Sequence, residues 1–351
     1  MEEIAQSDIA TNLMKVLGLK GKIKSFIEAF EDPFLITFQR SLEADYVQDL
    51  VGRKGKVEAV RIALSILKGH NATSGKIGGG RYQVFEGLED FVNSTLNTIP
   101  GVDIKIGYDK GGKGFVESIT VDGKVVPKFE SRESQKSKSK EHFEETFDKR
   151  EKESNEAWDT LTDYLDFMYK HGNKLSFGMT MMSLKSNMDS MLKAAALAKY
   201  YYVGPAMKSN QLRYEHMIPT EYIVMKLTQH FNGKKIDLKS LKDKYNVAVV
   251  PKSMDKNFDV QFQKVMPSTW NETMSETERY FNELMMGYPN MYALEVIGGK
   301  DKGEIIGQEF IELSNKKAEA KQLVNIPLVN DSKVIKASKD MSSEDVLNKA
   351  A

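Results

Sequence analysis

The chain has 351 residues and no cysteine, which excludes disulfide bonds, zinc–thiolate sites and cysteine nucleophiles. Lys and Arg total 50 and Asp and Glu total 50, so nucleic-acid binding would need a local basic surface. No apolar run reaches the roughly 20 residues of a membrane-spanning helix, and the acidic start is unlike a signal peptide. We therefore expect the protein to stay in the compartment where it is made, the cytoplasm, and not to enter a membrane.

Residues 1–130 are expected to form a helical domain that carries a small antiparallel sheet. Apolar spacing predicts helices at 9–17, 23–30, 57–67 and 82–96. Strands are expected at 102–108, 115–121 and 124–126. The dipeptide Asp122-Gly123 between the last two strands is a strong hairpin signal.

Two short patterns in this region suggest chemistry. Gly75-Lys76 invites comparison with a phosphate-binding loop, but Ile77 replaces the Ser or Thr that binds Mg²⁺, and a helix precedes the loop where a strand is required. Asp103-Ile104-Lys105 fits the acid-x-Lys element of restriction-type nucleases, but its usual Pro-Asp partner is missing. We interpret the first as an ordinary loop and keep the second as a weaker alternative.

Residues 131–155 are rich in Ser, Lys and Glu, and we interpret them as a charged linker or an exposed helix between two domains. The second domain, 156–315, should be largely helical, and 316–351 should be a polar, loosely held tail. Two long helices are expected at its start, one from Trp158 to His171 and one from Met181 to Tyr202. The expected fold class is therefore α+β and mainly helical.

The stretch from Leu212 to Asn257 holds the main candidate for chemistry. It predicts a strand that ends on Glu215-His216, helices at 220–231 and 238–244, a β-branched strand that starts at Asn246, and a new helix after Lys252. Strand, acid-histidine pair, second strand and helix is the order of parts in a ββα-metal nuclease site. Further on, Ser275 and Glu278 have the spacing of a capping box that opens a helix.

Glu215-His216 followed by Ile218 and Pro219, with a later Asn246 and an acid nine residues beyond it, resembles the HNH (ββα-metal) nuclease family. The resemblance implies His216 as general base, Asn246 as the residue that braces the loop, and Glu215 and Asp255 as ligands of a divalent metal, Mg²⁺ or Mn²⁺. The implied substrate is nucleic acid, and nearby basic residues could contact its phosphates. These basic residues are Lys208, Arg213, Lys252 and Lys256.

This sequence departs from the family pattern in three ways. The last ligand position is Asp instead of His or Asn, the gap between His216 and Asn246 is long, and no cysteine pairs brace the loop. A structural interpretation therefore stays open, in which Glu215 and His216 form a hydrogen-bonding pair and Asp255 caps the following helix.

The wider region 158–299 resembles a module of multidomain proteins from marine tailed phages. That resemblance implies a virion-associated location and virion proteins as partners. The alternative to a nuclease is therefore a non-catalytic virion or assembly module.

Overall fold

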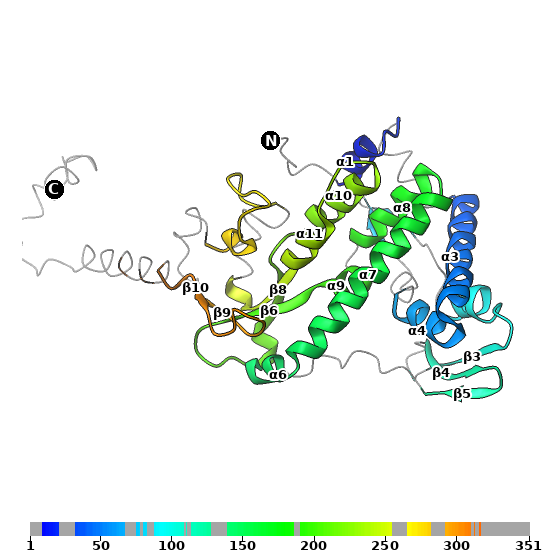
Figure 1. Ribbon diagram of the computed structural model, residues 1–351, viewed down its shortest axis with the longest axis horizontal. Helices are drawn as coiled ribbons and strands as arrows, with labels where there is room; N and C mark the ends of the chain where they lie inside the picture. Colours follow the sequence, from blue (N-terminus) through cyan, green and yellow to red (C-terminus); the bar gives the residue numbers. More distant parts are fainter. Residues whose placement is uncertain are drawn as a thin grey trace, which may run out of the picture.

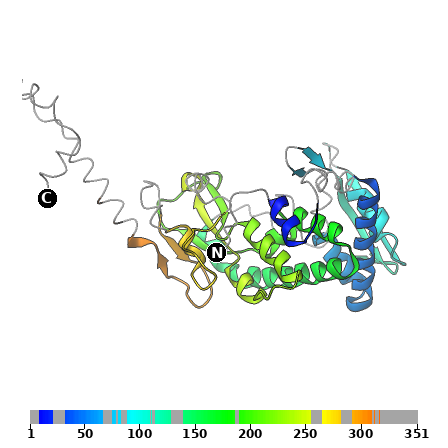
Figure 2. The same cartoon turned by 90° about the horizontal axis from the view of Figure 1, so that it is seen from above.

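The computed structural model describes residues 9–20, 32–66, 75–77, 80–82, 88–108, 110, 114–127, 139–185, 190–254, 265–281, 292–309, 312 and 316. Helices and strands are mixed, with one antiparallel sheet and one larger mixed sheet, which confirms the α+β class. Figures 1 and 2 place the small sheet and the last two strands at opposite ends of the molecule, with a long helix between them.

Helices make up most of the N-terminal part. They are α1 (Ile9–Val16), α3 (Pro33–Lys54), α4 (Lys56–Ile66), α5 (Leu88–Phe91) and the π-helix η3 (Val92–Leu96). Asp32 and Pro33 begin α3, because the Asp32 side chain accepts a hydrogen bond from the Phe34 N–H at 2.9 Å and proline suits the first helical position. Helices α1 and α4 confirm two predictions, the predicted helix at 82–96 begins only at Leu88, and 23–30 lies outside the described residues.

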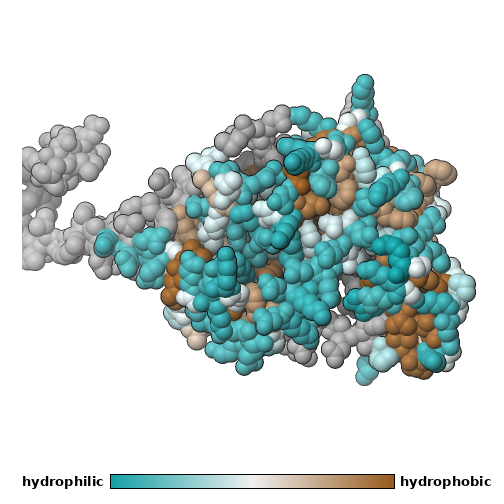
Figure 3. Space-filling view, in the orientation of Figure 1, coloured by the Kyte–Doolittle hydropathy of each residue, from teal (hydrophilic) through white to brown (hydrophobic). Residues whose placement is uncertain are grey.

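The strands of this part are β1 (Gly75–Ile77), β2 (Gly80–Tyr82), β3 (Val102–Tyr108), β4 (Gly114–Val121) and β5 (Lys124–Val126). The last three form the expected antiparallel sheet. Phe115 on β4 lies over Gly107 on β3, where an added Cβ would come within 2.7 Å of the ring, so this position requires glycine. Figure 3 shows a hydrophobic surface patch at this end, to which Phe115 and Val125 contribute exposed side chains.

The segment expected as a linker is helical where it is described. Residues 131–138 lie outside the described residues, and α6 (Lys140–Glu145) and α7 (Phe147–His171) follow. Phe143 and Phe147 in this segment are buried, so its helix has a packed face as well as a charged one.

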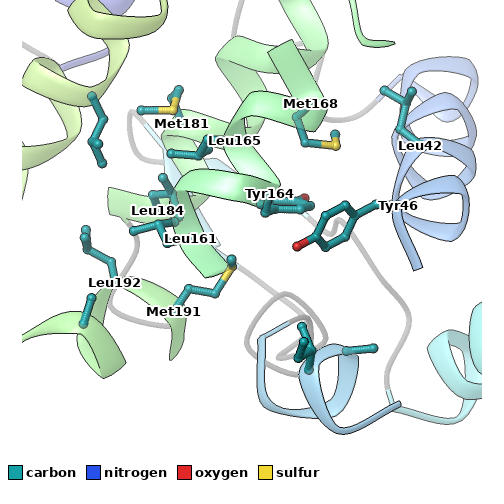
Figure 4. Packing of buried hydrophobic residues seen from close by; sticks show 14 of the residues in the cluster. Leu42, Tyr46, Leu161, Tyr164, Leu165, Met168, Met181, Leu184, Met191 and Leu192 are labelled. Atoms are coloured by element: carbon teal, nitrogen blue, oxygen red, sulfur yellow. The ribbon is translucent and has the colours of Figure 1, made fainter. Parts of the chain in front are cut away.

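Helix α7 is the centre of the main core. It packs against α3 on one side and against α8 (Lys174–Lys185) and α9 (Ser190–Ala195) on the other. Figure 4 shows Tyr46 of α3 facing Tyr164 of α7, with their ring centroids 5.2 Å apart. One hydrophobic cluster therefore contains residues from both sides of the expected domain boundary.

Leu184→Ala is expected to lower the free energy of unfolding by about 2–4 kcal/mol, because the Leu184 side chain is 1% exposed in this core. The measurement is urea unfolding of both proteins. Lys170→Ala, at an exposed position of α7, is the control and should change little. A negligible change for Leu184→Ala would mean that the methionine-rich face of α8 is a contact surface and not core.

The larger sheet is formed by β6 (Leu197–Tyr202), β7 (Leu212–His216), β8 (Asn246–Pro251), β9 (Leu294–Val296) and β10 (Ile305–Ile306). Its strand order is β10-β9-β6-β8-β7, in which only β6 and β8 are parallel neighbours. The predicted helix up to Tyr202 is therefore wrong after Ala195. The run 197–202 is rich in aromatic residues that favour strands, and it becomes the buried centre of this sheet.

Helices α10 (Thr220–Phe231) and α11 (Leu238–Lys244), and the short 3₁₀ helices η4 (Ser209–Gln211) and η5 (Glu276–Arg279), complete the described elements. The bounds of α10, α11, β7 and β8 agree with the sequence-based predictions. Asp237 caps α11 by accepting hydrogen bonds from two backbone N–H groups at 3.0 Å. Among the described residues, no helix has the length and apolar character needed to cross a membrane.

Candidate functional site

Strands β7 and β8 bring three of the predicted site residues together. Glu215 pairs with Ala248 and His216 pairs with Val247 in an antiparallel register. Just beyond β7, the Met217 N–H donates to the Asn246 carbonyl oxygen at 2.9 Å. Residues 252–254 after β8 are helical, so strand, strand and helix follow in the expected order. Asp255 and Lys256 lie outside the described residues.

The acid and the histidine leave β7 on opposite faces of the sheet, as neighbouring strand residues do. Glu215 shares its face with its partner Ala248 and with Asn246. His216 shares the other face with Val247 and with Tyr245, on whose ring it stacks. A phosphodiester that contacted both side chains would therefore have to lie across the end of β7.

Glu215 forms an ion pair with Arg279 of η5. The Arg279 Nη1 atom lies 3.1 Å from Glu215 Oε1, and it also donates to the His216 carbonyl oxygen at 2.5 Å. The arginine side chain is 1% exposed and the glutamate side chain 20% exposed, so this is a largely buried pair. The carboxylate that the HNH resemblance assigns to a metal is thus bound by a cation of the chain itself.

Asn246 is buried and holds η5 by a second contact. Its Nδ2 atom donates to Glu276 Oε1 at 2.7 Å and to the Asp243 carbonyl oxygen at 2.8 Å. The hydroxyl group of Tyr200 on β6 donates to the same Glu276 oxygen at 2.8 Å. Ala248, which lies between Tyr200 and Glu215 in the sheet register, leaves room for η5 above it.

Sequence analysis missed the roles of Glu276 and Arg279. The capping box at Ser275 was the available signal, and the Ser275 hydroxyl does accept a hydrogen bond from the Thr277 N–H at 3.2 Å. The helix that follows is a single 3₁₀ turn, and its two charged side chains point to residues far away in the sequence.

His216 is partly buried, and its ring stacks on that of Tyr245 with centroids 5.4 Å apart and planes 17° from parallel. Burial, and then the nearby charges of Arg279 and Lys193, lower the pKa of His216 to about 4. The imidazole is therefore neutral at pH 7, the form in which it can accept a proton.

The predicted phosphate-contacting residues that the structure describes are all exposed: Lys208, Arg213 and Lys252. The weaker alternative places Asp103 and Lys105 on the exposed face of β3. The acids of α5 that could have joined them have other partners, since Glu89 accepts a hydrogen bond from Tyr108 and Asp90 pairs with Arg40.

Within the part of the chain that the structure describes, no three His, Asp or Glu side chains are grouped to hold a metal ion. The chain matches no protein-family model, and no curated protein or solved structure is significantly similar to it. The argument for function therefore depends on the residues around β7 and β8.

Proposed function

We propose that the chain is a metal-dependent phosphodiesterase of the HNH type that acts on nucleic acid. The observation that carries the proposal is the position of His216. It is the last residue of a strand that pairs antiparallel with β8, and a helical turn follows β8. That order of parts is the one that the motif predicts.

In this proposal the neutral imidazole of His216 takes a proton from the water that attacks the phosphorus atom. Asn246 fixes the start of β8 beside His216, through its backbone contact with Met217 and its side-chain contact with Asp243. Arg213 and Lys252, both exposed, would contact the phosphate backbone.

The proposed metal ligands are the carboxylates of Glu215 and Asp255. Oxygen ligands of this kind suit Mg²⁺ or Mn²⁺, which when bound would polarise the scissile phosphate. Glu215 is 20% exposed, so an ion from solvent can reach it, but the Arg279 contact must first be broken.

A second candidate is a non-catalytic module of a phage virion or of its assembly. The specific observation in its favour is that Glu215 and Asn246 both hold η5, through Arg279 and Glu276. Side chains used in this way need no catalytic role, because a buried polar group requires a partner in any case.

The two candidates differ in what His216→Ala does. For a nuclease we expect the wild-type chain to cleave plasmid DNA or single-stranded RNA with Mg²⁺ or Mn²⁺ and not with EDTA. His216→Ala should then lose this cleavage while the melting temperature changes little. Gel analysis of the products and a thermal melt of each protein are the measurements.

His171→Ala is the matched control, because His171 is an exposed histidine at the end of α7, and it should keep full cleavage. A wild-type chain that cleaves neither substrate, together with a strongly destabilised His216→Ala variant, would reject the nuclease and support the second candidate.

A further inference from the structure

Arg279 stands where a cation is needed if Glu215 binds a metal. Its guanidinium donates to the Glu215 carboxylate and to the His216 carbonyl oxygen, so it contacts both halves of the acid-histidine pair. One carboxylate oxygen cannot keep this contact and bind a divalent ion at full strength, because the two positive charges would repel each other.

We propose that Arg279 is an autoinhibitory cation, and that divalent metal binds at Glu215 only when η5 moves and withdraws the guanidinium. This inference rests on the proposed function, since it takes Glu215 as a metal ligand. It adds that the structure shows the closed state of the site, in which the chain itself neutralises the carboxylate.

The surroundings of η5 limit the size of the movement. Trp270, Tyr280 and Phe281 on the same segment, 265–281, are buried and hold it against the rest of the fold. We therefore expect η5 and the Arg279 side chain to shift locally, while the segment as a whole stays in place.

Trp270 is placed to report this shift. Its indole N–H donates to the carbonyl oxygen of Ser275 at 2.9 Å, and Ser275 caps η5. The chain has two tryptophans, Trp158 and Trp270, so Trp158→Phe leaves Trp270 as the only one. The fluorescence of this variant then follows η5 without any measurement of cleavage.

The experiment is a titration of the full-length Trp158→Phe chain with Mg²⁺ and with Ca²⁺, neither of which quenches tryptophan. We expect a saturable change in Trp270 emission. Adding Glu215→Asp, which keeps the charge but withdraws the carboxylate by one methylene, should raise the midpoint about tenfold or more, a loss of about 1.4 kcal/mol. Glu278→Gln is the matched control, because Glu278 is an exposed acid on the same 3₁₀ turn, and it should leave the midpoint unchanged.

A further variant, Arg279→Gln, removes the competing charge and should lower the Mg²⁺ midpoint about tenfold, provided that circular dichroism shows it to be folded. If it is not folded, the titrations of the Glu215→Asp and Glu278→Gln chains decide the question by themselves.

The outcomes separate this inference from the proposed function. An emission change that depends on Glu215 in a chain that cleaves nothing supports the Arg279 inference and rejects the nuclease. Metal-dependent cleavage with no emission change supports the nuclease and rejects the inference. An emission change that Glu215→Asp leaves untouched places the metal elsewhere and also rejects it, and the absence of both responses rejects both.

Discussion

Arg279→Met should lower the free energy of unfolding by about 3–5 kcal/mol, the cost of breaking a buried ion pair. Methionine fills much of the arginine volume, but it leaves the Glu215 carboxylate and the His216 carbonyl oxygen without their donor. Removal of one partner costs more than the pair itself contributes, because the remaining charge keeps its desolvation penalty. Urea unfolding at pH 7 measures the loss.

Two further variants show whether the charge or the packing causes this loss. Arg279→Met combined with Glu215→Leu replaces the ion pair by apolar groups and should recover most of the stability. Glu276→Gln keeps an oxygen acceptor for Asn246 and Tyr200, so it should cost under about 1.5 kcal/mol. A loss under about 1 kcal/mol for Arg279→Met, the size expected for an exposed pair, would contradict a structural role for the guanidinium.

A second large effect is expected from Glu43, which lies in the interface between α3, α7 and α8. Burial raises the pKa of its carboxyl group from 4.5 to about 8, although hydrogen bonds with Tyr164 and Gln39 and the charge of Arg40 oppose this rise. The Tyr164 hydroxyl donates to Glu43 Oε1 at 3.1 Å. Gln39 lies one helical turn away, and its Nε2 atom donates to Thr180 of α8 at 2.8 Å. The folded state therefore keeps Glu43 protonated at neutral pH.

Because the folded state binds this proton more tightly than the unfolded state, stability is greatest below pH 4.5 and falls as the pH rises to about 8. The gap between the two pKa values corresponds to roughly 3–5 kcal/mol. Glu43→Gln should remove this decline, so that the variant matches wild type in acid and exceeds it at alkaline pH. Urea midpoints across this pH range measure the difference.

Glu58→Gln is the control with the opposite sign. The hydrogen bond from Arg61 lowers the pKa of Glu58, so its contribution is present at neutral pH and lost as the pH falls. Glu58 is largely exposed, and its effect should be small. Parallel pH profiles for wild type and Glu43→Gln would contradict a buried, protonated Glu43.

The sequence predicted those elements whose ends carry local signals. Helix α10 follows Pro219 and ends at Asn232-Gly233, and α11 begins after the capping side chain of Asp237. The register of β7 and β8 places Glu215, His216 and Asn246 together, as their order in the motif predicted. Caps and turns act over a few residues, so they can be read without knowledge of the rest of the fold.

The failures concern residues whose state depends on distant partners. Residues 197–202 have apolar spacing that suits a helix or a strand, and only β8 and β9 on either side make them a strand. Arg279 lies 64 positions from Glu215 along the chain, and no local pattern links them. The split of Glu215 and His216 onto opposite faces could have been foreseen, because it follows from strand geometry alone.

The position of β6 has a consequence for synthesis on the ribosome. Strand β6 ends at Tyr202, but its neighbour β9 begins at Leu294, about 90 residues later. At about 5–20 residues per second, an aromatic-rich strand waits roughly 5–20 s for that partner. During this time one of its edges is unpaired, and such an edge is a template for pairing with another chain. Slow translation between these two strands should therefore increase the fraction of newly made chains that aggregate.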